Sequence, residues 1–389
     1  MFHIADEDDI KKGRLTDIYF ERTKKILKAS GSNPSVKAEI FLKSLPEGYD
    51  WGIISGIEEI IKLLSGVNNL SIRCMPEGTA FKEFQPVMVI EGRYLDFGIY
   101  ETAILGFLCQ ASGIATKAAR CRIAAGDKKV YSFGARRVHP AITPMVERSA
   151  FIGGADGVST TLGAELINQK PVGTIPHALI LIMGDTIEAT RAFNEVIEPK
   201  IKRISLIDTF NDEKFEALRV AESLGNKLFG IRLDTPSSRR GSFKKILEEV
   251  RWELDIRGFN KIKLIVSGGI DEENILELKD IADSFGVGTA ISGARVLDFS
   301  MDIVEIEGKK ISKRGKMSGA KKVIRCAKCF NDKVILENDK TSGYSCEKCG
   351  GDYRDIFIEA VKEGRVLYNY PTASEIRERV VGQFKYLEI

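Results

Sequence analysis

Two glycine-rich turns follow consecutive strand-like runs in the second half of the chain. The turns contain Ser267, Gly268, Gly269, Gly288 and Thr289. Glycines carry no side chain, so backbone N–H groups there approach an anion closely at the start of a helix. Glycine pairs also form plain turns, but two on neighbouring strands late in an α/β barrel are typical of a phosphate site. We therefore expect a ligand that carries a terminal phosphate.

Arginines follow two other strand-like runs. Arg136 and Arg137 come shortly after the run that ends at Phe133, and an arginine fork binds carboxylate or phosphate through two hydrogen bonds. Arg232 and Asp234 stand two residues apart, which places them on one side of a strand end. Asp234 is a candidate for ribose hydroxyls or magnesium, and Arg232 for a second anion. The alternatives are solvated surface for the arginine pair and a simple salt bridge in the barrel mouth.

One of the three histidines, His177, lies where chemistry is plausible. It belongs to the stretch 172–180, in which Gly173 and Thr174 precede an apolar run. A reactive imidazole at this junction would face a pocket. The alternative is a core histidine that a neighbouring group satisfies. Asp208 lies at the end of another strand-like run. It is a candidate for the same roles as Asp234, but a weaker one.

Four of the seven cysteines form the strongest single pattern. They make two CxxC pairs that residues 330–345 separate: Cys326, Cys329, Cys346 and Cys349. Thiolates at this spacing close a tetrahedral zinc site. Because four thiolates leave no open coordination position, the pattern predicts a structural zinc, with a redox pair as the alternative.

The order of the elements predicts an α/β protein with three parts. Residues 1–110 mix helical and β patterns and predict an N-terminal α/β sandwich, which parts of 298–322 and 355–389 are expected to complete. Residues 111–297 alternate short β-rich runs with helices, which predicts a parallel sheet and a small α/β barrel. An open doubly wound sheet is the alternative. Residues 323–354 form the zinc ribbon.

The strand-like runs of the barrel carry the candidate residues at their carboxyl ends, where both α/β architectures place their chemistry. The runs are 130–133, 155–159, 172–174, 204–208, 228–233, 262–267 and 286–289. The prediction therefore brings the two glycine turns, the arginines and the acidic residues to one edge of the sheet.

Composition narrows the class of protein. The 389 residues are 43% hydrophobic and 29% charged, with a net charge of +3, as in an ordinary soluble protein and with little basic excess for a nucleic-acid binder. The apolar region 99–119 contains Glu101, Gln110 and Lys117, which favours a buried helix over a membrane span. The start of the chain is acidic and lacks an apolar core, so a cytoplasmic protein is expected.

Taken together, these residues resemble nicotinate phosphoribosyltransferase, in the form that carries a zinc-ribbon insert. The resemblance covers nearly the whole chain. It rests on the order and spacing of Thr16 to Tyr19, Phe133 with Arg136 and Arg137, Gly173 and Thr174 with His177, Arg232 to Asp234, and the two glycine turns. It implies an incomplete α/β barrel, an N-terminal α/β sandwich domain and a small zinc-ribbon-like subdomain, in a dimer or larger homo-oligomer with sites at the interface.

The resemblance also implies roles for the site residues. Tyr19 would reach in from the partner subunit and stack on the pyridine ring, with Phe133 on the opposite face. Arg136, Thr174 and Arg232 would hold the nicotinate carboxylate or neighbouring phosphate groups. Asp234 would hold the ribose, and His177 would be the phosphohistidine. The 5′-phosphate would be bound by the two glycine turns, at Ser267, Gly268, Gly269, Gly288 and Thr289. Of these, His177, Arg232 and Asp234 would act in catalysis.

The activity implied is nicotinate phosphoribosyl transfer in NAD biosynthesis or salvage. Nicotinate and phosphoribosyl pyrophosphate would give nicotinate mononucleotide and pyrophosphate, with magnesium and with ATP hydrolysis coupled through the phosphohistidine. No membrane or nucleic-acid partner is expected. The family's Ser-Gly-Asp after the Arg-x-Leu-Asp motif is replaced here by Thr235, Pro236 and Ser237, a departure that bears on ATP coupling and on the metal contacts.

Three other functions remain open. Quinolinate phosphoribosyltransferase has the same fold, but its substrate carries two carboxylates and needs a denser basic pocket. A nicotinamide-specific relative would use the same ring slot. From another class, a zinc-ribbon nucleic-acid-binding protein would use the basic segment 309–328, although the near-neutral total charge argues against that function.

Overall fold

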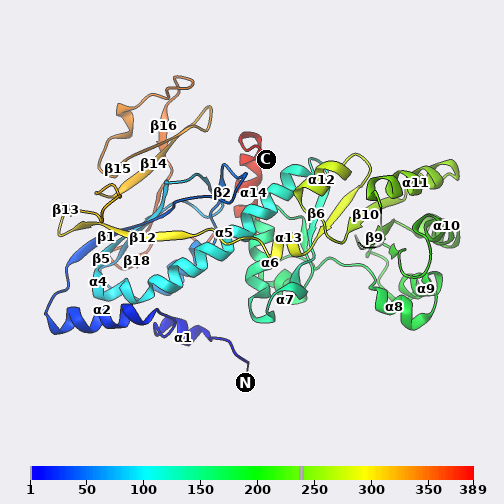
Figure 1. Ribbon diagram of the computed structural model, residues 1–389, viewed down its shortest axis with the longest axis horizontal. Helices are drawn as coiled ribbons and strands as arrows, with labels where there is room; N and C mark the ends of the chain where they lie inside the picture. The colour runs from blue at the N-terminus through cyan, green and yellow to red at the C-terminus, as the bar shows by residue number, and fades with distance from the viewer. Residues whose placement is uncertain (1, 236–237, 239–240) are drawn as a thin grey trace. The chain divides into compact units, whose positions relative to one another are not determined.

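The computed structural model describes residues 2–235, 238 and 241–389, and these fold into two compact units. Unit 1 combines Met1–Thr116 with Arg295–Ile389, and unit 2 is Lys117–Ala294. Figure 1 shows the elements of each unit. The unit boundaries lie close to the limits expected for the barrel, residues 111 and 297. One helix, α5 (Glu101–Ala124), begins in unit 1 and ends in unit 2.

A seven-stranded antiparallel sheet forms the centre of unit 1. The strand order is β13-β12-β1-β5-β3-β17-β18. Strands from both ends of the chain therefore share one sheet. Their bounds are β1 Ser35–Leu42, β3 Ser71–Cys74, β5 Pro86–Arg93, β12 Phe299–Ile306, β13 Lys309–Lys310, β17 Ile358–Lys362 and β18 Arg365–Val366. A separate small pair joins β2 (Gly52–Ile53) to β4 (Ala80–Phe81).

Helices cover one face of this sheet and close the core of unit 1. The fully buried residues of α3 (Ile57–Leu64) are Ile57, Ile60, Ile61 and Leu64, the i, i+3, i+4 spacing of a helix with one apolar face. Each such side chain contributes roughly 1.5–3 kcal/mol when it leaves water. The other helices of this unit are α1 (Glu7–Lys11), α2 (Ile18–Ala29), α4 (Tyr94–Phe97) and α14 (Ala373–Gln383).

The helical stretch Tyr94–Ala124, which contains α5, is long and apolar enough to cross a membrane by length and composition. Its side chains at Ile104, Leu108, Ala111 and Ile114 are buried in the protein, and two of them belong to the core of unit 1. This burial is that of a core helix, which agrees with the sequence-based expectation of a buried helix.

Unit 1 also contains a three-stranded sheet, which we call the ribbon sheet, and ion pairs join it to the seven-stranded sheet. Its order is β15-β14-β16. Glu337 of this region pairs with both Lys37 (2.7 Å) and Arg73 (2.9 Å) of the large sheet, and Arg73 also reaches Asp355 (3.0 Å). Val323 adds an apolar contact to the core. The strands are β14 Lys321–Cys326, β15 Asp332–Leu336 and β16 Tyr353–Asp355.

A half-buried carboxyl group in unit 1 makes stability depend on pH. Burial, together with the nearby carboxylates of Asp302 and Asp17 and against the opposing charge of Lys313, raises the pKa of Glu101 to about 7. Below the unfolded pKa both states hold the proton; between that value and about 7 only the folded state holds it, so the contribution to stability is lost as the pH rises through 7. We expect Glu101→Gln to melt higher than the native protein at pH 8 and similarly at pH 4.5.

Thermal unfolding of both proteins across this pH range measures the effect. Glu47→Gln, at an exposed position, is the matched control and should keep the native pH dependence. If the melting temperatures of the native protein and Glu101→Gln depended on pH in the same way, the role given to Glu101 would be contradicted.

Unit 2 is built on a six-stranded parallel sheet in the order β7-β6-β11-β10-β9-β8. The first strand of this series, β6, pairs with both the second strand, β7, and the last, β11. Sequential strands that return to the first are those of a closing barrel, and only the pairing of β7 with β8 is missing among the described residues. The strands are β6 Lys129–Ser132, β7 Gly157–Val158, β8 Ile204–Leu206, β9 Gly230–Leu233, β10 Lys263–Ser267 and β11 Ser284–Val287. This strand order agrees with the predicted incomplete α/β barrel better than with the doubly wound alternative.

The predicted strand over 172–174 is wrong, and its loss explains the gap in the barrel. These residues are irregular, with a single ladder-like bond from the Val172 N–H to the carbonyl of Val158 (2.8 Å). Pro171 and Pro176 on either side lack the N–H groups that a central strand must donate. The segment therefore crosses the opening between β7 and β8 as a loop.

Helices connect the strands of unit 2 and cover the sheet. Most begin at a residue that caps the helix with its side chain, as Asp185, Asp212 and Ser242 do, which satisfies N–H groups that have no partner within the helix. The helices are α6 Thr143–Ile152, α7 Thr161–Leu166, α8 His177–Met183, α9 Thr186–Val196, α10 Glu213–Leu224, α11 Phe243–Ile256, α12 Glu272–Leu278 and α13 Thr289–Ser292.

Candidate active site

A cavity of about 530 Å³ lies within unit 2 at the carboxyl ends of its strands. We call it the front cavity. Strand ends of a parallel sheet converge at one edge, so residues far apart in the sequence meet here. Its lining includes Phe133, Arg136, Arg137, Ser159, Gly173, Thr174, Arg232, Asp234, Ser267, Gly268, Gly269, Asp271, Gly288 and Thr289. Most of the residues that sequence reasoning selected therefore surround one space.

The two glycine turns form one wall of the front cavity. Gly268 and Gly269 both have positive φ, +87° and +70°, which residues with a Cβ rarely adopt. A Cβ on Gly268 would also lie 3.0 Å from the backbone oxygen of Asp234. Asp271 then caps α12 through a capping box, and Thr289 begins α13 after the second turn. Backbone N–H groups at two helix starts thus line one wall, an arrangement suited to a phosphate.

Phe133 forms a flat apolar wall that a missing side chain makes possible. Its N–H donates to the carbonyl of Val287 (2.8 Å), which continues the β6–β11 ladder. A Cβ on Gly286 would lie 2.4 Å from the Phe133 ring, so only glycine leaves room for it. The ring of Tyr131 stacks at 6.2 Å between centroids. The ring face is available to a planar ligand.

Arg232 and Asp234 lie at the centre of a polar set. Arg232 Nη1 donates to Thr174 Oγ1 (2.6 Å), and its Nη2 lies 3.9 Å from Asp234 Oδ2. Burial lowers the pKa of the Arg232 guanidinium, while Asp234 and Asp208 raise it. Asp234 Oδ1 accepts from Ser267 Oγ (2.8 Å). The predicted salt bridge exists, but it is long, so both groups keep hydrogen-bonding capacity for a ligand.

Asp208 is hydrogen-bonded to this polar set. The sequence analysis treated it only as a weaker candidate than Asp234. Its Oδ2 accepts from the Asp234 N–H (3.1 Å), and its Oδ1 lies 3.3 Å from His177 Nε2. Burial raises the pKa of Asp208, and His177 opposes the shift. His177 begins α8 and does not line the front cavity. The structure therefore joins His177 to the site through Asp208 rather than directly.

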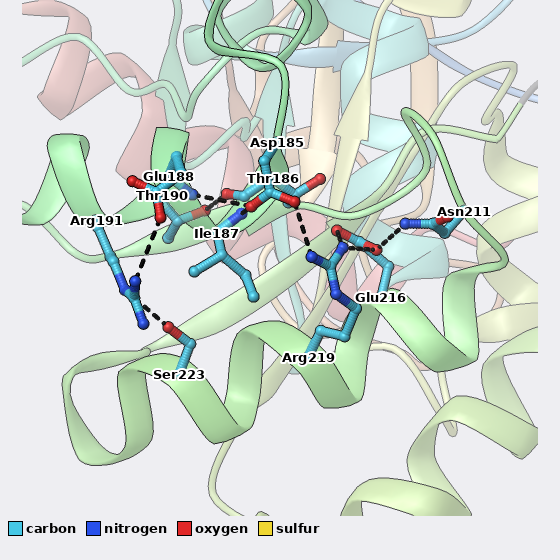
Figure 2. A network of polar contacts seen from close by, with 10 residues as sticks. All are labelled: Asp185, Thr186, Ile187, Glu188, Thr190, Arg191, Asn211, Glu216, Arg219 and Ser223. Atoms are coloured by element: carbon cyan, nitrogen blue, oxygen red, sulfur yellow. Dashed lines mark hydrogen bonds and ion pairs between the residues drawn. The ribbon is translucent and has the colours of Figure 1, made fainter.

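A polar network holds the loop that carries Asp208. Figure 2 shows Arg219 of α10 between Glu216 and Asp185, at 2.8 and 2.7 Å. Glu216 is fully buried and also accepts from Asn211 (2.6 Å), which lies in the loop after β8. Asp185 caps α9, and its hydrogen bond from Arg219 lowers its pKa. The loop is thus tied to two helices, which restricts the position of the carboxylate at its start.

Ser159 is a lining residue that sequence reasoning missed, together with the buried Glu147 that positions it. Glu147 Oε1 accepts from the Ser159 N–H (2.8 Å), Ser159 Oγ (2.9 Å) and the Thr160 N–H (3.0 Å), while Oε2 accepts from Thr160 Oγ1. The only signal in the sequence was a charged residue within the apolar face of a predicted helix.

We expect Glu147→Ala to destabilise the protein by about 3 kcal/mol, because four donors lose one buried acceptor group. It should also raise the KM for substrate, since the Ser159 loop lines the front cavity. Urea unfolding and steady-state kinetics measure the two effects. Glu165→Ala, at an exposed position on α7, is the control; equal stability of the two variants would contradict this role.

Tyr19 and the cysteines belong to unit 1. Tyr19 lies on α2, is 55% exposed and contacts the Phe20 ring; its predicted place in a partner's site stays a prediction. The sulfur atoms of Cys326, Cys329, Cys346 and Cys349 all lie within 4.8 Å of one another. Zinc–sulfur bonds of about 2.3 Å in a tetrahedron separate sulfurs by about 3.8 Å, so this set fits zinc. Pro236 and Ser237, part of the departure from the family motif, lie outside the described residues.

Comparison with known proteins gives the family. Models described as quinolinate phosphoribosyl transferase, N-terminal domain and C-terminal domain, match residues 17–112 and 114–302. Nicotinate-nucleotide pyrophosphorylase from Pyrococcus furiosus, known from a crystal structure, has 53% sequence identity with this chain. The two structures have a TM-score of 0.97, over 100% of this chain and 99% of that one.

More distant relatives carry another name. Nicotinate phosphoribosyltransferase of Bacillus subtilis is 28% identical over 321 residues, 80% of this chain and 63% of that protein. This chain thus spans less than two thirds of that relative's length. Human nicotinic acid phosphoribosyltransferase has a TM-score of 0.77 at 17% identity, over 96% of this chain and 94% of that one, which shows the shared fold alone.

The expected assignment to nicotinate phosphoribosyltransferase is therefore wrong. Both matching family models and the 53% identical structure point to the quinolinate family instead, and nicotinate as substrate with ATP-coupled transfer falls with that assignment. The physical reason is that glycine turns, strand-end arginines and the Arg232–Asp234 pair make a phosphoribosyl site, which the two families share. The predictions of an enzyme and of phosphoribosyl transfer are confirmed at that level.

Proposed function

Since the chain belongs to the quinolinate phosphoribosyl transferase family, we propose that it transfers a phosphoribosyl group to quinolinate and decarboxylates the product. The substrates would be quinolinate and phosphoribosyl pyrophosphate; the products would be nicotinate mononucleotide, pyrophosphate and carbon dioxide, in NAD biosynthesis. The observation that carries the proposal is the front cavity, where three arginines and two glycine turns face one space.

The arginines suit a substrate with two carboxylates. Arg136 and Arg137 are exposed at the cavity rim, and Arg232 lies deeper, with 14% of its side chain exposed. Three guanidinium groups can bind two carboxylates and a departing pyrophosphate through paired hydrogen bonds. The ring of Phe133 would lie against the pyridine ring, and Thr174 would fix the fork of Arg232.

The first chemical step needs little proton transfer. The pyridine nitrogen attacks C1 of the ribose, and the C1–oxygen bond breaks, with its electron pair leaving on pyrophosphate. Asp234, 22% exposed, would stabilise the positive charge that develops on the ribose. The glycine turns would hold the 5′-phosphate, so the ribose is oriented for attack.

The second step removes a carboxylate. The bond from C2 of the pyridine ring to its carboxyl carbon breaks, and carbon dioxide leaves. The electron pair stays on this C2, beside the positively charged ring nitrogen. C2 then takes a proton from solvent. Loss of carbon dioxide makes the sequence irreversible, so ATP hydrolysis is not needed to drive it. The phosphohistidine role once expected for His177 has no step here.

Two metals fit the residues present. Magnesium bound with phosphoribosyl pyrophosphate would neutralise the leaving group's charge; Asp234, which lines the front cavity, offers the carboxylate oxygens that this ion prefers. The four cysteines would hold zinc in a closed structural site outside unit 2. A dimer with Tyr19 at the partner's site remains part of the proposal, as does the absence of nucleic-acid and membrane partners.

The deciding experiment offers labelled quinolinate or nicotinate with phosphoribosyl pyrophosphate and magnesium, each with and without ATP. We expect nicotinate mononucleotide and carbon dioxide from quinolinate in equal yield in both ATP lanes. The proposal would be overturned if nicotinate gave product and quinolinate did not. It would also be overturned if the rate with quinolinate depended on ATP.

A further inference from the structure

A second cavity, of about 580 Å³, opens within unit 2 at the opposite ends of the same strands. We call it the rear cavity. Lys129, Ile204, Lys263 and Ser284 begin β6, β8, β10 and β11, and all four line it. It therefore enters the barrel from the amino ends of the strands, whereas the front cavity lies at the carboxyl ends.

The rear cavity extends into unit 2 beside the irregular segment 172–174. Barrel interiors are normally filled by layers of side chains. Gly157 and Gly230 pack directly behind two lining residues, since a Cβ on them would lie 2.9 Å from the side chain of Val172 and 2.7 Å from that of Ile265. The irregular residues 172–174 line this space. The resulting space is as large as many ligand pockets.

The walls and the rim of the rear cavity differ in chemistry. Tyr131, Phe133 and Phe229 supply aromatic surface inside, and the first two rings are nearly parallel, at 13°. The lining holds five lysines and two aspartates: Lys128, Lys129, Lys200, Lys202, Lys263, Asp127 and Asp283. Lys263 pairs with Asp283 (2.9 Å), whereas Lys202 lies over the Phe229 ring, 4.0 Å from its centroid.

Two lysines stand out at this rim. Lys200 and Lys202 are both exposed, and among the described residues no ion pair to an acid is found for either. Lysine is a point charge that suits phosphate, and two of them beside aromatic walls suit a molecule with a planar ring and a phosphate group. A single pyridine carboxylate would fill only a small part of the volume.

The two cavities share a partition. Phe133, Val172, Gly173 and Thr174 line both of them. Thr174 also accepts the hydrogen bond from Arg232 (2.6 Å), and three of the four residues belong to the irregular loop across the barrel gap. A ligand in the rear cavity would therefore touch the same residues that shape the ring slot of the front cavity.

We propose that the rear cavity binds a mononucleotide, with its base among the aromatic walls and its phosphate at Lys200 and Lys202, and that occupancy changes the affinity of the front cavity for its pyridine substrate. This site does not depend on which pyridine is the substrate, so its test is separate from that of the proposed function.

The test measures binding of AMP and of nicotinate mononucleotide to the whole protein by calorimetry, with phosphoribosyl pyrophosphate and magnesium present to occupy the front phosphate site. We expect one additional site per chain. Lys200→Ala/Lys202→Ala should weaken binding about tenfold or more, because two charged donors to the phosphate are lost. Lys309→Ala/Lys310→Ala removes two exposed lysines of β13 in unit 1 and should leave binding unchanged.

A second variant fills the space instead of removing charge. Ile201 lines the rear cavity and is 36% exposed, so Ile201→Trp should abolish binding without unfolding the protein. In steady-state assays the nucleotide should shift the KM for the pyridine in the native protein and not in Ile201→Trp. Binding of only one nucleotide would support the site and identify its ligand.

Three results would overturn the proposal. They are no binding of either nucleotide, equal binding by the two double variants, or inorganic phosphate binding as tightly as AMP, which would leave the aromatic walls without a role. If the nucleotide binds but quinolinate is not turned over, the rear-cavity proposal is supported and the proposed function is contradicted. If quinolinate is turned over but no nucleotide binds, the proposed function is supported and the rear-cavity proposal is contradicted.

Discussion

Replacing Asp234 by Asn should lower kcat/KM for quinolinate by about 10³-fold, the scale expected when a preorganised charge opposite the transition state is lost. Asn has the same shape and can still accept from Ser267 Oγ, so the hydrogen bond of 2.8 Å that orients the side chain survives. What disappears is the negative charge beside the ribose, where positive charge develops as pyrophosphate leaves. The loss should fall mainly on kcat, because the ground-state ribose is neutral there.

Two further variants separate charge from position. Ser267→Ala removes the orienting donor alone and should cost only about tenfold. Asp280→Asn, at an exposed position, removes an equal charge elsewhere in unit 2 and should have no effect. Melting temperatures of all three should match the native protein within a few degrees. An Asp234→Asn enzyme within threefold of native kcat/KM would return this carboxylate to a structural role.

Replacing Cys346 by Ala should release the zinc that the four thiolates are expected to hold and lower the melting temperature of the ribbon sheet by at least about 10 °C. The predicted metal content of the native protein is one zinc per chain. Ile324, Ile335 and Tyr353 form the small apolar cluster around these cysteines, which is too small a core to fold without a cross-link. Chelation of the native protein should give the same shift.

Cys109→Ala is the matched control, because this cysteine lies half-buried on α5 and outside the tetrad. It should retain its zinc and melt close to the native temperature. Elemental analysis with calorimetry measures both quantities. Native protein without zinc, or a melting curve that chelator does not change, would rule out the structural metal.

The sequence predicted the parallel α/β sheet and phosphoribosyl transfer, though not the right pyridine substrate, because these depend on local signals. Glycine pairs, arginine forks and CxxC pairs report on the few residues around them, and strand ends bring them together whatever the rest of the chain does. Asp234 with Ser267 and the cysteine tetrad could therefore be placed before the fold was known. The change in β and helical rhythm predicted three parts, whereas the structure divides into two compact units, one of which contains the ribbon sheet.

Other features were beyond such signals. The segment 172–174 has strand-like composition, but its flanking prolines and the open edge of the barrel decide against a ladder. Glu147 and Asp208 owe their roles to buried partners on other elements, which spacing along the chain does not reveal. The choice between pyridine substrates depends on which groups converge from several loops, and a shared phosphoribosyl site does not distinguish the families.

The contact between the ribbon sheet and the seven-stranded sheet of unit 1 has a consequence for stability on heating. Lys37, Glu337, Arg73 and Asp355 form a connected chain of ion pairs around it, and nearby Lys321 pairs with Glu39 (3.1 Å). The cost of removing charges from water falls as temperature rises, while the gain from apolar burial levels off. This contact should thus hold relatively better in hot solution than in cold, and added salt should loosen its outer, exposed pairs first.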